Sequence, residues 1–119
     1  MLSALTFTGC ISYMFSKSST VYVRLKDRYG YDMPNEIVYM YAKPYEGAVA
    51  YKRSEALHAI MTDSNGGAEF VVTEIDMTVT KNSRFEFVVF EDDVVVGTKQ
   101  VIVPEGKRES IVLRVGGKD

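Results

Sequence analysis

Apolar and polar residues alternate along several short segments of this chain, and turn-forming residues separate the segments. In residues 20–26, Val and Leu are interleaved with Tyr, Arg and Lys, a period of two that is typical of a strand with one buried face. Similar patterns place further strands at residues 36–43, 57–62, 68–73, 84–91, 94–103 and 109–115. Seven strands at intervals of roughly 8–14 residues, without a long helix, predict an all-β fold, a seven-stranded antiparallel sandwich of two sheets.

One tight loop in the middle of the chain is specified by its own residues. Thr62-Asp63 and Gly66-Gly67 bracket it, and glycine reaches positive φ while Asp and Asn side chains bond the turn backbone. We therefore expect residues 57–62 and 68–73 to form a β-hairpin around this loop.

The other connections carry weaker signals. Residues 74–81 are expected to cross between the sheets, and Gly97 marks the position of an expected bulge. Residues 36–43 are apolar at both sets of alternating positions, so this strand is expected to be covered on both faces. Pro44 stops this strand, and residues 45–55 lack clear alternation and predict an irregular excursion, with a helix over 46–59 as the alternative.

Length, charge and composition exclude several classes of function. The chain has 119 residues, which suffices for one core, and its 14 Lys and Arg and 16 Asp and Glu are spread rather than clustered. A nucleic-acid surface is therefore not expected. Cys10 is the only cysteine and His58 the only histidine, which excludes an intrachain disulfide and a structural zinc site. We expect no cofactor and no metal, and no apolar run reaches the roughly 18 residues of a membrane span.

The first 19 residues differ from the rest of the chain. Residues 1–15 are apolar and uncharged, and small residues lead directly to Cys10. This arrangement resembles the lipobox of bacterial lipoproteins, in which a signal peptidase cuts before a cysteine whose thiol receives lipid. The resemblance implies a truncated lipoprotein signal, lipidation at Cys10, a short tether at residues 16–19, and a location in the cell envelope, in the periplasm or at the outer membrane. The alternative is a first strand in which Cys10 is a small buried hydrophobe.

Two segments carry a family resemblance that covers about residues 20–115. Residues 21–30 read Val-x-Val-x-Leu-x-Asp-x-x-Gly, and residues 62–70 read Thr-Asp-x-x-Gly-x-Ala-x-Phe. This pattern resembles the prealbumin-like, or transthyretin-like, domains related to the carboxypeptidase regulatory domain, which are Ig-like sandwiches common in secreted proteins of gut Bacteroidetes. The resemblance implies the fold of residues 20–115, followed by a tail at 116–119, and says almost nothing about function.

An enzymatic function is not expected. The hydroxyisourate hydrolases, the enzymatic group among transthyretin-like proteins, use two histidines, an arginine and a C-terminal Tyr-Arg-Gly-Ser. This chain has His58 alone and ends in a different sequence at residues 113–119. We expect His58 to be a strand histidine that faces solvent or a satisfied edge rather than a catalytic base.

Tyrosines supply the candidate contact surface, because a tyrosine ring combines a large rigid area with one polar group. The predicted loops place four of them in reach of a partner: Tyr29, Tyr31, Tyr45 and Tyr51. The alternative is that tyrosines on strands half-cover a face of the sandwich.

These observations lead to two functional expectations. The first is a non-enzymatic cell-envelope lipoprotein module that binds or spaces a protein or glycan partner and meets the membrane only through the lipid on Cys10. The alternative is a pilus or fimbrial subunit assembled by strand donation, in which the apolar residues 2–15 are the donated strand.

Overall fold

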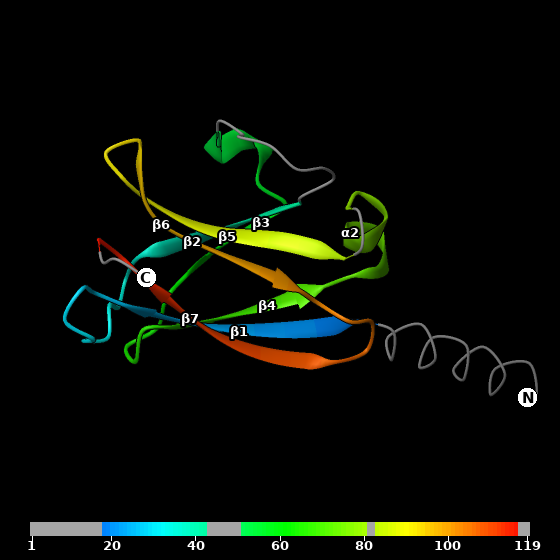
Figure 1. Cartoon of the computed structure of the whole chain (residues 1–119), viewed down its shortest axis with the longest axis horizontal. Helices are drawn as coiled ribbons and strands as arrows, with labels where there is room; N and C mark the ends of the chain where they lie inside the picture. The colour runs from blue at the N-terminus through cyan, green and yellow to red at the C-terminus, as the bar shows by residue number, and fades with distance from the viewer. Residues whose placement is uncertain (1–17, 43–50, 81–82, 117–119) are drawn as a thin grey trace, which may run out of the picture.

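The computed structural model describes residues 18–42, 51–80 and 83–116, which form two sheets packed face to face (Figure 1). One sheet has three strands in the order β4-β1-β7, where β1 is Ser19–Lys26, β4 is Gly67–Val72 and β7 is Arg108–Arg114. The other has four strands in the order β3-β2-β5-β6, where β3 is His58–Met61, β2 is Ile37–Ala42, β5 is Arg84–Glu91 and β6 is Val94–Ile102. The prediction of an all-β sandwich with seven strands in two sheets is confirmed.

One pair of neighbouring strands is parallel. β1 and β7 run in the same direction, with Thr20 opposite Arg108 and Lys26 opposite Arg114. The prediction of a wholly antiparallel sandwich is therefore wrong for this pair. Parallel neighbours need a long crossover connection. In the sequence, all four strands of the other sheet lie between β1 and β7, so the connection is long enough.

The hairpin expected around residues 62–67 is not formed, because β3 and β4 belong to different sheets. The loop is nevertheless the tight turn that its residues predict. Asp63 Oδ1 accepts the backbone N–H groups of Asn65 at 2.8 Å and of Gly67 at 3.0 Å, and Gly66 has a φ of 76°. A Cβ at Gly66 would lie 3.0 Å from two backbone atoms of neighbouring segments. Turn chemistry thus fixed the shape of the loop but not the sheet that the next strand joins.

Alternate side chains of both sheets point inward and form a single core. The largest fully buried side chains of this core are Phe70, Phe85, Phe87, Leu25, Met40, Leu113, Val21, Val23, Val38, Val72 and Val89. Phe70 of β4 and Phe87 of β5 meet edge to face across the two sheets, with ring centroids 5.0 Å apart. Each buried side chain of this size contributes around 1.5–3 kcal/mol. The core can therefore hold the domain together without a disulfide.

β5 and β6 form a hairpin with a two-residue turn. Asp92 and Asp93 have φ values of 52° and 69°, the left-handed conformation that two-residue hairpin turns require. The register shifts where Val89 pairs with Gly97 and Phe90 pairs with Val95, which confirms the predicted bulge. A Cβ at Gly97 would lie 2.8 Å from the backbone oxygen of Arg114, so glycine lets the last strand approach β6 closely.

A short helix, α2 (Glu74–Thr78), lies in the connection from β4 to β5 and confirms that this segment crosses between the sheets. Thr73 caps it: its hydroxyl accepts the Asp76 N–H at 3.1 Å, and the Asp76 carboxylate accepts the Thr73 N–H at 3.0 Å. α2 and the start of β1 lie at one end of the sandwich, and the loop between β1 and β2 lies at the other (Figure 1).

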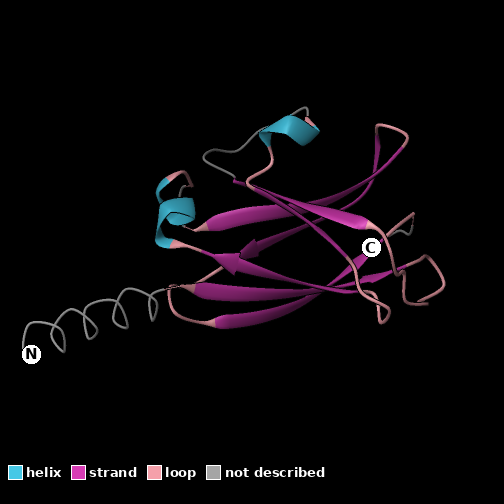
Figure 2. Cartoon of the chain, turned by 180° about the vertical axis from the view of Figure 1, so that it is seen from behind, coloured by secondary structure: helices cyan, strands magenta, loops and turns pink. Residues whose placement is uncertain are grey.

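The described part of the predicted excursion, residues 51–57, lies over the outer face of the four-stranded sheet (Figure 2). It contains a single 3₁₀ turn, η1 (Arg53–Glu55), and continues without a helix to Leu57, whose N–H donates to Met40 O at 2.8 Å. The segment covers β2 from outside, since Tyr41 is 6% exposed while Val38 and Met40 on the inner face are fully buried. Coverage on both faces is therefore seen at the Tyr41 end of the strand, whereas Ile37 at the other end is 38% exposed.

Candidate functional site

The loop between β1 and β2 holds two of the predicted contact residues, Tyr29 and Tyr31. Asp27 organises the loop, because its Oδ1 accepts the N–H groups of Tyr29 at 2.8 Å and Tyr31 at 2.9 Å. Its own N–H donates to Tyr31 O at 2.9 Å, and Gly30 completes the turn with a φ of 92°. Tyr29 and Tyr31 are 76% and 71% exposed. The loop therefore presents two large rings to water from a backbone that is already ordered.

Charged groups support the base of this loop. Lys26 Nζ lies 2.8 Å from Asp32 Oδ1, and Arg24 lies 3.3 Å from the same oxygen. The hydrogen bond from Lys26 lowers the pKa of the Asp32 carboxyl below its usual value. The backbone N–H groups donated by Gly67 and then Asn65 likewise lower the pKa of Asp63 in the adjacent turn. Both carboxylates are therefore held in the ionised form.

Tyr51 lies away from this loop, on the covered outer face of the four-stranded sheet. Its hydroxyl donates to Glu86 Oε1, and its ring packs against Tyr41 with centroids 4.9 Å apart. Tyr41 in turn donates to Lys52 O at 2.8 Å. Burial, followed by the bond to Glu86, raises the pKa of Tyr51 well above its usual value. Tyr51 thus joins the 51–57 segment to the sheet.

The three predicted tyrosines in the described residues do not lie together. The 27–31 loop and the segment that carries η1 lie far apart in both views of the chain (Figures 1 and 2). Tyr45 and Cys10 lie outside the described residues. The contact surface predicted from the tyrosines therefore reduces, in the described part of the chain, to Tyr29 and Tyr31.

A hollow of about 310 Å³ lies beside η1 on the outer face of the four-stranded sheet. Asn35, Glu36, Ile37, Tyr39, Arg53, Met61 and Phe90 line it. Tyr39 meets Phe90 edge to face at 5.3 Å between centroids, and the Arg53 guanidinium lies 4.5 Å above the Phe90 ring. Arg53 also pairs with Asp93, so its charge is already compensated. Aromatic rings and an arginine are common at protein contact sites, but here the arginine is already paired within the fold.

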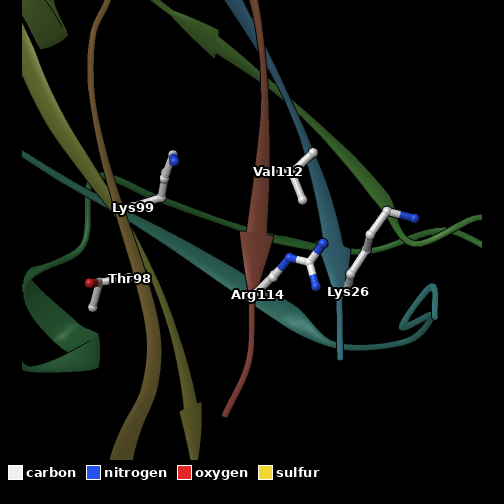
Figure 3. A pocket seen from close by; sticks show the side chains of 5 residues that line it. All are labelled: Lys26, Thr98, Lys99, Val112 and Arg114. Atoms are coloured by element: carbon white, nitrogen blue, oxygen red, sulfur yellow. The ribbon is translucent and has the colours of Figure 1, made fainter. Parts of the chain in front are cut away.

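A second hollow, of about 330 Å³, has a cationic lining where β1, β6 and β7 come together. Figure 3 shows its five side chains, Lys26, Thr98, Lys99, Val112 and Arg114. The Lys26 amine points away from the Arg114 guanidinium, toward its partner Asp32, and Lys99 lies on the other side of β7 (Figure 3). Because the three cations do not converge on one point, this hollow does not have the geometry of an anion-binding site.

His58 has a carboxylate partner that the sequence did not indicate. Its Nε2 lies 2.8 Å from Asp76 Oδ2, the carboxylate that caps α2 through the Thr73 N–H. The pair links β3 to α2 and satisfies an Asp76 side chain that is only 8% exposed. The expectation of a histidine at a satisfied edge fits this geometry. The capping pattern Thr73-x-x-Asp76 was the signal that could have found both the helix and the partner.

Sequence reasoning also missed the ring and cation cluster of Arg53, Phe90 and Tyr39. The only sequence signal was that β2 and β5 are apolar on both faces, which requires a covering layer. Within the described ranges, no group of three or more His, Cys, Asp or Glu side chains could hold a metal ion. No helix in that part of the chain is long and apolar enough to span a membrane.

Comparison with known proteins supports the fold alone. No family model matches this sequence, and no curated protein sequence is detectably similar to it. Among similar solved structures is the crystal structure of a DUF3823 family protein from the Bacteroidetes species Parabacteroides merdae, with a TM-score of 0.51 and 8% sequence identity. The match covers 82% of this chain and 45% of that one, so this chain spans less than half the length of the protein it resembles. At this identity the likeness establishes a shared β-sandwich fold.

Proposed function

We propose that this chain is a non-enzymatic module of a bacterial cell envelope, anchored through a lipid on Cys10, that binds a protein or glycan partner with the 27–31 loop. The observation that carries the proposal is the pair of exposed rings, Tyr29 and Tyr31, on a loop that Asp27 holds in place. Exposed aromatic rings on an ordered backbone lose little conformational entropy when they bind, which favours recognition.

We also propose that the sandwich is of the prealbumin-like type. Residues 21–30 and 62–70, which carry the resemblance, lie side by side because β1 pairs with β4 and the Leu25 N–H donates to Gly66 O at 2.7 Å. A constant-type immunoglobulin domain places its first, second, fifth and fourth strands in one sheet. Here the first strand pairs with the fourth and seventh, so the strand order differs from that of a constant-type immunoglobulin domain.

The contact loop is tested by photo-crosslinking in a producing bacterium. A photoreactive amino acid replaces Tyr29 or Tyr31 in the full chain, and the matched control places it at Val71, an apolar residue that is 52% exposed on β4. We expect one defined crosslinked species from the two loop positions and none from the control. Equal crosslinking from all three positions, or none from the loop, would contradict the proposed contact.

The anchor is tested by intact mass. The chain is expressed in a Gram-negative host with its own upstream sequence, and the Cys10→Ser variant serves as the control. We expect the mass of a diacylated or triacylated Cys10 in the parent protein and an unmodified chain in the variant. An unmodified parent protein in the soluble fraction would rule out the lipid anchor.

A second candidate, a subunit assembled by strand donation, is favoured by the edge strand β6. A hollow of about 480 Å³ lies against its second half, lined by Arg84, Gln100, Val101 and Ile102. Within the described residues, residues 98–102 make backbone hydrogen bonds only to β5, so their other edge is open to an added strand. Concentration-dependent oligomers with a trimmed, unlipidated N-terminus would favour this candidate over the anchored module.

A further inference from the structure

The end of the sandwich that carries α2 exposes apolar side chains. The capping box turns the Asp76 carboxylate inward, where it is 8% exposed, and Met77 packs against the core. Ile75 in the first turn of α2 and Val79, the residue that follows its last turn, are 77% and 48% exposed. Ile102, at the end of β6, is 55% exposed at the same end. We call these three residues the α2 apolar cluster. No other described residue covers them enough to bury them.

The chain enters the fold at the same end. Ser19 begins β1, and its hydroxyl donates to Pro104 O at 2.6 Å and accepts the Gly106 N–H at 2.9 Å. Eight residues, 11–18, separate Cys10 from Ser19. Nine residue-to-residue steps therefore join Cys10 to Ser19, and they span at most about 32 Å when fully extended. A lipid on Cys10 would hold the α2 end within about that distance of the bilayer surface.

Both ends of the sandwich carry charges of both signs. At the end opposite α2, the carboxylates of three loops lie near the cations Arg28 and Arg114, and two of them are paired: Asp32 with Lys26 and Arg24, and Asp93 with Arg53. The α2 end carries Glu74, Arg84, Glu105, Lys107, Arg108 and Glu109. Charge therefore does not distinguish the two ends for an anionic membrane.

We propose that the α2 end is a membrane seat: Ile75 and Val79 rest in the boundary between lipid headgroups and acyl chains, and the 27–31 loop is held away from the bilayer. The inference rests on the lipid anchor of the proposed function and adds to it an orientation. The lipid supplies the attachment, while the α2 apolar cluster buries side chains that water otherwise surrounds. The exposed tyrosines are then presented to partners in the surrounding space.

The lone cysteine makes the orientation measurable. In the lipidated protein the Cys10 thiol is occupied, so a cysteine introduced as Ile75→Cys is the only free thiol and takes a fluorophore. The matched control is Val94→Cys in the β5–β6 hairpin at the opposite end, because Val94 is 62% exposed. Both proteins are reconstituted in vesicles of phosphatidylethanolamine and phosphatidylglycerol that contain nitroxide-labelled lipid. We expect severalfold stronger quenching at position 75 than at position 94.

The outcomes separate the seat from the anchor. The intact mass of each labelled sample reports whether Cys10 carries lipid, and the quenching reports the orientation. Lipidated protein with equal quenching at both positions overturns the seat and leaves the anchor standing. A missing lipid overturns the anchor and the seat with it. In a second measurement, Ile75→Asp in the lipidated, Val94→Cys-labelled protein should increase quenching at position 94, because the domain no longer stands on its α2 end. An unchanged signal there would also overturn the seat.

Discussion

The two sheets share one core, but their outer faces meet different surroundings. The outer face of the four-stranded sheet lies under residues 51–57, and Val88 and Glu86 beneath them are 0% and 6% exposed. The outer face of the three-stranded sheet is open to water: Arg24 and Arg114 are exposed, and Val112 is 43% exposed. The outer face of the four-stranded sheet is therefore covered in part, with Ile37 and Met61 still exposed, whereas the outer face of the three-stranded sheet is open.

The sequences of the strands explain this difference between the two outer faces. β1 alternates strictly between buried residues and more exposed ones, as expected for a strand with one face in water. β5 has four buried apolar side chains in Phe85, Phe87, Val88 and Val89, on both of its faces. A strand that is apolar on both faces requires a covering on each, and the 51–57 segment supplies the outer one.

The two outer faces should differ most in how much an introduced charge lowers the free energy of unfolding. Val88→Asp places a carboxylate beneath the 51–57 segment, at a position that is 0% exposed, and should lower the free energy of unfolding by more than about 3 kcal/mol. Val112→Asp places the same charge on the open face and should change it by no more than about 1 kcal/mol. Urea denaturation of both variants measures the two values.

The isosteric controls Val88→Thr and Val112→Thr separate charge from shape. Val88→Thr should be clearly destabilising, because a hydroxyl is buried, while Val112→Thr should be nearly neutral. Similar losses for Val88→Asp and Val112→Asp would mean that the two outer faces do not differ in hydration.

Much of this architecture could be predicted from sequence, because strand existence depends on local alternation. The seven strands and the bulge at Gly97 follow from side-chain patterns within single segments, as does the outer cover over Tyr41 in β2. Strand pairing could not be predicted in the same way. The Asp63–Gly67 turn has the same local chemistry whether the next strand joins its own sheet or the other one, and here it joins the other.

The candidate site was predictable only in part, for a related reason. Tyr29 and Tyr31 lie in a loop whose exposure follows from its turn residues. Tyr51 lies in a segment without alternation, and its position depends on Glu86, which is 35 positions away in the chain. The bond between His58 and Asp76 is likewise a tertiary contact, between β3 and α2, that no local pattern encodes.

The second prediction concerns Tyr51, which joins the 51–57 segment to the outer face of the four-stranded sheet and whose effect on stability depends on alkaline pH. Tyr51→Phe removes the hydrogen bond to the buried Glu86 carboxylate and should lower the free energy of unfolding by about 1–2 kcal/mol at neutral pH. The folded state raises the pKa of Tyr51, so its neutral form stabilises the protein below the unfolded pKa of about 10, and this contribution is lost as the pH rises further.

The pH dependence distinguishes this contribution from a simple loss of packing. The parent protein should lose stability more steeply than Tyr51→Phe above about pH 10, so the gap between them should narrow in that range. Chemical denaturation at a series of alkaline pH values measures it, and Tyr29→Phe, on the exposed loop, serves as the control. A gap that stays constant with pH would show that Tyr51 ionises as easily in the folded protein as in the unfolded chain.

The smallest effect on stability is expected for Asp32, which pairs with Arg24 of the open face, and its pH dependence lies in the acidic range. Asp32 accepts from Lys26 and Arg24, and the hydrogen bond from Lys26 lowers the pKa of the carboxyl. Its ionised form therefore stabilises the folded state above the unfolded pKa of about 4, and this contribution is lost as the pH falls through the lower folded value. Asp32→Asn should cause a small loss of thermal stability at neutral pH that shrinks in high salt and vanishes in acid, because an exposed ion pair is screened. Thermal denaturation at two salt concentrations and several acidic pH values measures this. A loss that persisted in acid would mean that Asp32 stabilises the loop by packing or turn geometry, and the open face would then resemble the covered one.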